Sequence, residues 1–149
     1  MIKIKTGDLL RAKENVIAHQ VNCYGAAGGL AAAVFRKYPY AENDYLQLIG
    51  RMQPKALLGM AQFTGEQKDG HIICNLYGQL DPGADYRPDR LEQALQQLAA
   101  TARIMNWSVA LPWRLSCGIC GGDWDEVQKI IERTMEGVEC VIYRRKGDA

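Results

Sequence analysis

Short apolar runs rich in β-branched residues alternate along the chain with longer segments whose apolar positions recur at a helical period. This alternation is typical of an α/β domain in which helices cover a sheet. The pattern predicts strands at residues 1–5, 16–21, 57–64, 72–77, 109–111 and 140–143, with a turn at Lys68-Asp69-Gly70. It predicts helices at 30–38, 41–49, 89–102 and 124–135, a loop at 78–87 and a frayed polar tail at 144–149.

Two of the predicted helices carry start signals. Asp89 and Glu92 have the spacing of a capping box, and Asp123 and Glu126 repeat it. In that motif the first side chain accepts a hydrogen bond from a free backbone N–H of the first turn. We therefore expect Asp89 and Asp123 to cap the helices that follow them. The first of these helices also has one apolar stripe, formed by Leu91, Ala94, Leu95, Leu98 and Ala102.

Two glycine-containing loops, at residues 22–30 and 116–124, each join a predicted strand to a predicted helix. Glycine permits backbone angles that turn successive N–H groups inward, and a helix N-terminus adds positive partial charge. Two such loops at one end of a sheet would hold a diphosphate between them. Each loop taken alone is also consistent with an ordinary turn, because glycine is common in turns between strands and helices.

The second loop contains a C-x-x-C pair, Cys117 and Cys120. A redox dithiol normally begins a helix, whereas Asp123 places the helix start after both cysteines. A zinc site would need two further ligands, and the remaining cysteines and histidines lack zinc-finger spacing. We therefore expect backbone-lining or packing cysteines and no metal site, with dithiol chemistry as the alternative.

Composition and charge limit the classes of protein to which this chain can belong. The 149 residues, 48% of them hydrophobic, are enough for one substantial core, so we expect one domain over residues 1–149. The formal net charge is +1, which gives no long-range attraction for DNA or a membrane surface. Five scattered cysteines, no secretory signal and no long apolar run lead us to expect a reduced, cytoplasmic protein.

The order of the motifs resembles that of a macrodomain. The likeness covers nearly the whole chain and is greatest to the branch with the terminal ADP-ribose protein glycohydrolases and the yeast ADP-ribose-1''-phosphate phosphatase. The segments that carry it are Lys5-Thr6-Gly7-Asp8-Leu9, Val16-Ile17-Ala18-His19-Gln20-Val21-Asn22-Cys23, Gly28-Gly29-Leu30-Ala31, Arg36-Lys37-Tyr38-Pro39, Leu111-Pro112, Cys117-Gly118-Ile119 and Gly122-Asp123-Trp124.

The resemblance implies a three-layer α/β/α macrodomain with a mixed central sheet that binds ADP-ribose at the strand ends. It places Asp8 on the adenine amino group with Leu9 beside it, and Asn22 near the distal ribose. From the residues alone, Asp8 is equally suited to an Asx turn, and the Asn22 side chain to a bond with its own loop. The implied first diphosphate loop is Gly28, Gly29 and Leu30, and the second is Ser116, Cys117, Gly118, Ile119, Cys120 and Gly121.

The chain departs from the glycohydrolase pattern at the catalytic positions. Gln79 stands where those enzymes have a lysine, and Cys120 where they have an aspartate. An amide cannot form the covalent adduct that an amine forms with an opened ribose. The remaining catalytic candidates are His19 with Asp81 or Asp85, a pair suited to general acid/base chemistry. The competing interpretation is a core histidine and solvated turn aspartates.

Two functions therefore stay open. One is hydrolysis of a phosphate, an acyl group or an ADP-ribosyl linkage on the distal ribose, and the other is non-catalytic reading of ADP-ribose. We expect a monomer without cofactor whose partner is ADP-ribose or an ADP-ribosylated small molecule or protein. Tyr24 and Trp113 are candidates to stack on the base or close over the ribose. An NAD-linked oxidoreductase is disfavoured, because no G-x-G-x-x-G follows the first strand.

Overall fold

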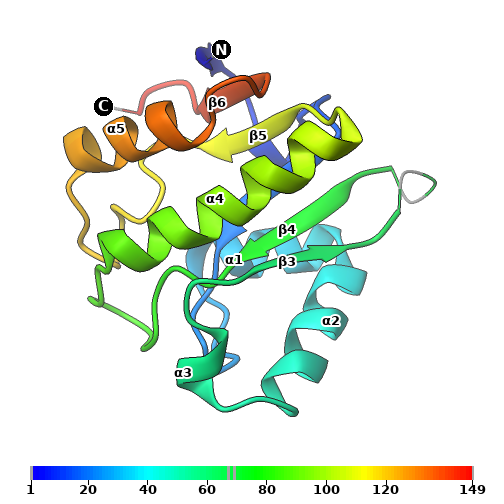
Figure 1. Cartoon of the computed structure of the whole chain (residues 1–149), viewed down its shortest axis with the longest axis vertical. Helices are drawn as coiled ribbons and strands as arrows, with labels where there is room; N and C mark the ends of the chain where they lie inside the picture. Colours follow the sequence, from blue (N-terminus) through cyan, green and yellow to red (C-terminus); the bar gives the residue numbers. More distant parts are fainter. Residues whose placement is uncertain (1, 67, 69, 149) are drawn as a thin grey trace.

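A computed structural model describes residues 2–66, 68 and 70–148 of the chain. Within these residues six strands form one sheet in the order β1-β6-β5-β2-β4-β3 (Figure 1). The strands are β1 (Ile2–Thr6), β2 (Val16–Gln20), β3 (Ala61–Thr64), β4 (Ile72–Leu76), β5 (Val109–Pro112) and β6 (Cys140–Arg144). Neighbouring strands pair in parallel except β3, which is antiparallel to β4. The predicted mixed sheet is confirmed.

Helices cover both faces of the sheet, and Figure 1 shows α4 in front of it with α1 behind. They are α1 (Gly29–Lys37), α2 (Pro39–Ile49), α3 (Pro54–Leu57), α4 (Pro88–Met105) and α5 (Trp124–Thr134), and a 3-10 turn, η1 (Leu9–Arg11), follows β1. One buried cluster joins α4 and α5 to the sheet, and a second joins α1 and α2 to its other face. The result is the three-layer α/β/α architecture that the resemblance to a macrodomain implies.

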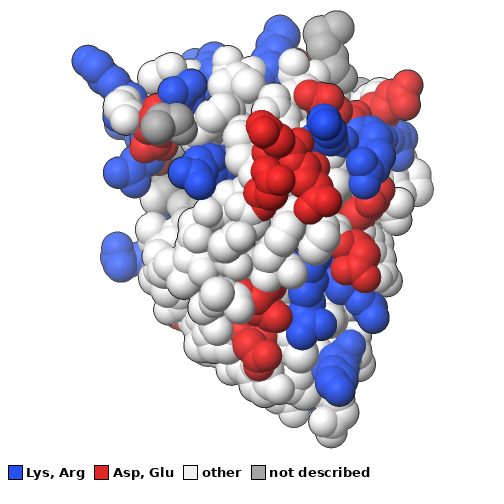
Figure 2. Space-filling model, turned by 90° about the vertical axis from the view of Figure 1, so that its left-hand side faces the viewer, with Lys and Arg blue, Asp and Glu red and all other residues white. Residues whose placement is uncertain are grey.

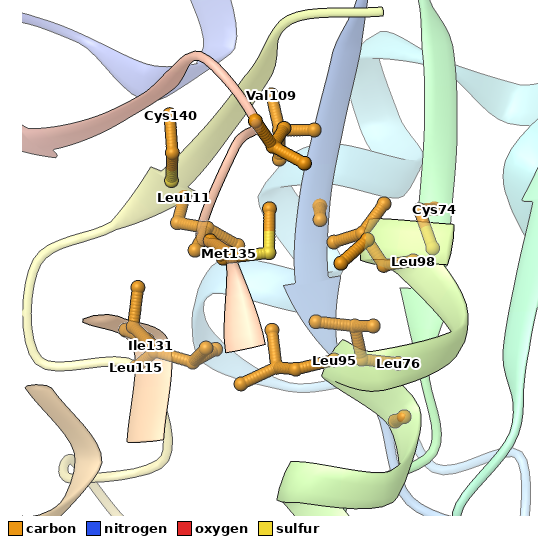
Figure 3. Packing of buried hydrophobic residues seen from close by; sticks show 14 of the residues in the cluster. Cys74, Leu76, Leu95, Leu98, Val109, Leu111, Leu115, Ile131, Met135 and Cys140 are labelled. Atoms are coloured by element: carbon orange, nitrogen blue, oxygen red, sulfur yellow. The ribbon is translucent and has the colours of Figure 1, made fainter. Parts of the chain in front are cut away.

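Strand alternation decides which side chain enters which cluster. On β2, Val16 and Ala18 face the α4 and α5 side, whereas Ile17 faces α1 and α2. Figure 3 shows the first cluster, where Leu95 and Leu98 of α4 pack toward the sheet. Each such fully buried side chain stabilises the fold by about 1.5–3 kcal/mol.

The segment at 57–64 is only partly a strand. Residues 61–64 form β3, whereas Leu57, which is buried in the core, is the last residue of the helix α3 that begins at Pro54. Proline suits the first turn of a helix, where its missing N–H removes no bond. Gly59, at φ +92°, then turns the chain toward β3. The turn predicted at Lys68-Asp69-Gly70 includes Asp69, which lies outside the described residues.

The predicted cap of α4 is wrong. The helix begins at Pro88 with Arg87 as its N-cap residue, so Asp89 lies inside the first turn. Proline favours an extended residue before it, and this sets the boundary at Arg87. Glu92, the expected box partner, instead accepts a hydrogen bond from Arg133 of α5 at 2.6 Å. The cap of α5 is confirmed, because Asp123 accepts from the Asp125 N–H at 3.1 Å.

The described part of the C-terminal tail forms a hydrogen-bonded turn. The Asp148 N–H donates to the carbonyl of Arg145 at 3.0 Å, and the Arg145 N–H donates back to the Asp148 carboxylate at 3.2 Å. Arg144 donates from Nε to the Asp148 carbonyl at 2.9 Å. Its guanidinium also lies 4.8 Å from the centroid of the Trp113 ring, which joins the tail to the end of β5.

Charge is distributed over the surface with both signs. On the face in Figure 2, Lys and Arg lie among Asp and Glu, with uncharged surface between them. This agrees with the formal net charge of +1. An anionic ligand must therefore be held by local groups. Among the described helices, none combines the length and the apolar character needed to span a membrane.

Candidate functional site

The cleft of the molecule lies where two neighbouring parallel strands send the chain to opposite faces of the sheet. β2 pairs with β5, and β2 leads to α1 on one face while β5 leads to α5 on the other. Connections that diverge in this way leave a crevice at the carboxyl ends of the strands. The two glycine loops follow these two strands, so both border the crevice.

Three adjoining cavities make up the cleft. The inner cavity, about 250 Å³, is lined by Gln20, Asn22, Tyr45, Gln79, Gly83 and Cys120, among others. The middle cavity, about 410 Å³, lies between Gly28, Gly29 and Leu30 on one side and Ser116, Gly118 and Ile119 on the other. The outer cavity, about 400 Å³, is lined by Asp8, Leu9, Trp113, Tyr143 and Arg145. Gln20, Gln79 and Cys120 line both the inner and middle cavities, and Leu30 and Trp113 both the middle and outer ones.

Asn22 holds the first glycine loop in shape. Its Oδ1 accepts from the N–H groups of Tyr24 at 2.9 Å and Ala26 at 3.3 Å, and its Nδ2 donates to the Ala26 carbonyl at 2.7 Å. Tyr45 of α2 donates to the Asn22 carbonyl at 2.8 Å. The predicted bond from Asn22 to its own loop is confirmed, and the same side chain lines the inner cavity.

The N-terminus of α1 is open toward the middle cavity. Its N-cap residue is Gly28, and no side chain of the described residues caps it. A Cβ atom added at Gly28 or Gly29 would meet no atom within 4 Å, so the backbone there is bare. The first N–H groups of a helix lack partners within the helix, and the helix dipole makes this end positive. This is the local geometry of an anion site.

The second loop offers backbone rather than a helix end. Ser116 lies at φ +67°, and the Gly122 N–H donates to its carbonyl at 2.9 Å, which closes the loop. Within the described part of the chain, no acceptor receives the N–H groups of Gly118, Ile119 and Cys120. Because Asp123 already caps α5, this loop would meet an anion with its own N–H groups.

The two cysteines of the C-x-x-C pair make local hydrogen bonds within and beside the second loop. All five are free thiols. Cys117 donates to the Leu115 carbonyl at 3.2 Å, and burial raises its pKa to about 11. Cys120 lies at the wall shared by the inner and middle cavities, where the Ser116 hydroxyl donates to its sulfur at 3.6 Å. Within the described residues, no group of three or more His, Cys, Asp or Glu could hold a metal ion.

His19 lies in the core rather than in the cleft. Its exposure is 0%, and its Nε2 is 2.6 Å from Oδ1 of Asn75, its register partner on β4. The Asn75 amide donates to the Ala41 carbonyl at 3.2 Å, so its oxygen faces His19, and Nε2 must be the protonated nitrogen. Burial lowers the pKa of His19 to about 4, against the opposing effect of the Asn75 hydrogen bond.

Neither of the two candidate aspartates is a hydrogen-bond partner of His19 within the described residues. Asp85 accepts from the N–H groups of Leu80 at 2.7 Å and Asp81 at 3.0 Å, and from Arg87 Nε at 3.0 Å. Burial works against its charge, but these hydrogen bonds prevail and lower the pKa of the carboxyl. Asp81 is exposed. The geometry therefore does not support the predicted pairing of His19 with either aspartate.

The outer cavity contains some of the residues that the sequence analysis proposed for the adenine. Asp8 is exposed, and it accepts from the Leu10 N–H at 3.0 Å, which is the Asx turn considered above. Asp8 and Leu9 both line the outer cavity. Trp113 separates the outer and middle cavities, whereas Tyr24 is 52% exposed and lines none of the three.

Several residues of the cleft escaped the sequence reasoning. Gln20 and Tyr45 line the inner cavity, Arg114 lines the middle one and Arg145 the outer one. The sequence could have identified Gln20 as a cleft residue, because it ends the strand that leads into the first glycine loop. No sequence pattern points to Tyr45, because α2 reaches the loop only through the tertiary fold.

Comparison with known proteins identifies the family. The sequence pattern of the Macro domain family matches residues 18–131, which is more than half of the chain. The chain is 30% identical over 152 residues to a DNA ADP-ribosyl glycohydrolase of Mycobacterium tuberculosis, covering 99% of this chain and 43% of that protein. It thus spans less than half the length of that relative. It is 27% identical over 158 residues to an ADP-ribose 1''-phosphate phosphatase of Lodderomyces elongisporus, covering 95% and 97% respectively.

Solved structures agree with the sequence match. The macrodomain of Mycobacterium tuberculosis DarG superposes with a TM-score of 0.82 at 29% identity, covering 96% of this chain and 97% of that one. Thermosipho africanus DarTG in complex with ADP-ribose gives a TM-score of 0.82 at 16% identity, covering 99% and 42%, and so supports the fold alone. From the family match, the sheet order and the cleft between two glycine loops, we conclude that the chain belongs to the Macro domain family.

Proposed function

We propose that this Macro domain binds ADP-ribose, either free or as the end group of a larger molecule. The diphosphate lies in the middle cavity, the adenine in the outer cavity and the terminal ribose in the inner cavity. The observation that carries the proposal is the open N-terminus of α1, which faces the uncapped N–H groups of the second loop across the middle cavity.

The middle cavity suits a diphosphate in charge as well as in shape. Arg114 lines it, and the bare backbone at Gly28 and Gly29 allows phosphate oxygens to approach the N–H groups closely. Charge-assisted hydrogen bonds from these donors are stronger than neutral ones. In the outer cavity, Leu9 and Trp113 supply apolar and aromatic surface for a purine ring, and Asp8 supplies an acceptor for an amino group.

The named relatives support this assignment. The DNA ADP-ribosyl glycohydrolase and the ADP-ribose 1''-phosphate phosphatase both act, by their names, on derivatives of ADP-ribose. The yeast relative is matched over nearly its whole length, and the bacterial one over less than half.

Hydrolysis of a substituent on the distal ribose is the second candidate, and the relatives' names favour it. Asp81 is the predicted catalytic residue that the geometry leaves accessible, because it is exposed and precedes the cavity-lining Pro82. Turnover of O-acetyl-ADP-ribose that is lost in Asp81→Asn, with ADP-ribose affinity retained, would support an enzyme. Absence of turnover of acetylated, phosphorylated and DNA-linked ADP-ribose would leave a reader.

Calorimetric titration with ADP-ribose, with AMP and NAD as controls, tests the binding proposal. We expect saturable binding of ADP-ribose that is clearly tighter than binding of either control. Gly28→Val should abolish it while leaving the thermal midpoint nearly unchanged, because the new side chain meets only the cavity and φ at Gly28 is −137°. Gly50→Val, outside the cleft, is the matched control. Binding of ADP-ribose by Gly28→Val with wild-type affinity would exclude the proposed diphosphate position.

A further inference from the structure

The hydrogen-bonding capacity of the inner cavity is fixed by a chain of amides. Gln79 donates from Nε2 to two backbone carbonyls, of Asp81 at 2.7 Å and Gly83 at 3.2 Å. Its Oε1 accepts from Gln20 Nε2 at 2.8 Å. Turning the Gln79 amide over would set its oxygen against those two carbonyls, so the orientation is determined. Both Gln79 hydrogens are therefore used, and what remains is a lone pair on Oε1.

Asn22 supplies the complementary group. Its Oδ1 already accepts from two backbone N–H groups of the first loop, whereas Nδ2 makes one bond, to the Ala26 carbonyl. An amide nitrogen carries two hydrogens, so one of them is available. Among its side chains, the inner cavity thus presents an unused acceptor at Gln79 and an unused donor at Asn22, and Ile119 and Cys120, whose backbone N–H groups have no acceptor among the described residues, also line it.

Charge is absent from this cavity, unlike the middle one. Among the described residues that line it, the ionisable side chains are Tyr45 and Cys120. Burial raises the pKa of Tyr45, so its hydroxyl stays protonated. The cationic side chain of the neighbouring space, Arg114, lines the middle cavity and not the inner one.

We propose that the inner cavity selects a neutral, hydroxyl-bearing sugar and discriminates against one that carries a phosphate. A sugar hydroxyl both donates and accepts, so adjacent hydroxyls match an acceptor at Gln79 and a donor at Asn22. A phosphate has acceptor oxygens only at neutral pH, and it would face the Gln79 oxygen with no cationic side chain among the described lining residues to offset the repulsion. The N–H groups of Ile119 and Cys120 also border this cavity, but in the proposed complex they already bind the diphosphate. This inference rests on the proposed binding of ADP-ribose and specifies which end groups that site accepts.

Competition between ADP-ribose and ADP-ribose-1''-phosphate tests the inference. We expect the phosphorylated ligand to bind about tenfold more weakly or worse, the usual effect of leaving a buried acceptor facing another acceptor. The phosphorylated ligand should also be recovered unchanged at the end of the titration. Equal or tighter binding, or its conversion to ADP-ribose, would overturn the inference. Failure of both ligands to bind would instead overturn the proposed function and the inference with it.

A charge substitution locates the discrimination. Gln79→Lys exchanges the free acceptor for a cation, so the ratio of the two affinities should shift toward ADP-ribose-1''-phosphate by about tenfold. Gln96→Lys adds the same charge at an exposed position of α4 and should leave the ratio at its wild-type value. If the ratio is the same in all three proteins while ADP-ribose still binds, Gln79 does not set the preference. Circular dichroism of Gln79→Lys verifies that the substitution leaves the fold intact.

Discussion

Protonation of His19 should destabilise the fold at acid pH. The unprotonated Nδ1 is buried and has no hydrogen-bond partner among the described residues, so a proton placed there would introduce an unpaired charge into the core. Burial lowers the pKa of His19 in the folded protein from 6.5 to about 4. The unfolded chain therefore takes up a proton near pH 6.5, and the folded chain does so only near pH 4. Protons in this window favour unfolding.

The size of the effect follows from linkage. A difference of one unit in pKa corresponds to about 1.4 kcal/mol, so the shift at His19 amounts to about 3 kcal/mol. This contribution is fully present above pH 6.5 and is lost progressively as the pH falls toward 4. Carboxylates with lowered pKa, such as Asp85, titrate as well. The wild type and a His19 variant share these carboxylates, so their contribution to the free energy of unfolding cancels when the two proteins are compared.

Urea unfolding, followed by tryptophan fluorescence between pH 7.5 and 4.5, measures this contribution. His19→Gln keeps a donor for Asn75 and removes the titrating group, so between pH 7.5 and 4.5 its free energy of unfolding should fall by about 2.5 kcal/mol less than that of the wild type. His71→Gln removes the other histidine and is the matched control. Parallel curves for the wild type and His19→Gln would refute the reasoning. Unchanged ADP-ribose affinity in His19→Gln is expected, because His19 lines none of the three cavities.

Three further substitutions test the second glycine loop and the residues around it. Gly122→Ala should lower both the thermal midpoint and the ADP-ribose affinity. The new Cβ would lie 2.5 Å from the Ser116 carbonyl oxygen and 2.7 Å from the Tyr86 ring, so the loop would have to move. A wild-type thermal midpoint together with wild-type affinity would contradict this. Tyr86→Phe removes a hydroxyl that donates to Glu126 at 2.5 Å, and should cost about 1 kcal/mol in urea unfolding. Trp113→Ala should weaken ADP-ribose about tenfold in calorimetry by removing aromatic surface, and an unchanged affinity would exclude Trp113 from the site.

Much of the fold follows from local pattern. The order of strands and helices and the positions of both glycine loops could be predicted because apolar periodicity and glycine content are properties of contiguous residues. The predicted start of α4 was wrong because Pro88 sets the first residue of the helix, which leaves Asp89 inside the first turn and not at the cap. The 54–57 helix was missed because an apolar run this short does not distinguish a helix from a strand.

The site was predicted less completely, for reasons of tertiary geometry. His19 was a catalytic candidate because it precedes the first loop, with a core histidine as the competing interpretation. Strand parity places it with Ile17 instead, on the face that α1 covers. By the same parity, Gln20 lies on the other face, at the strand end, where it contributes to the cleft. Two contacts join residues that are far apart in the sequence: Tyr45 with the first loop, and Arg144 with the Trp113 ring. No local sequence pattern predicts either contact.

The uncapped start of α1 makes ligand binding a part of folding energetics. Other proteins satisfy such N–H groups with a side chain worth about 1 kcal/mol, and this helix lacks one. A ligand that binds only the folded state at 100 times its dissociation constant adds about 2.7 kcal/mol to the free energy of unfolding. Amide exchange at residues 28–31 should therefore slow on binding more than exchange in the sheet interior. The ligand would complete the first turn of α1.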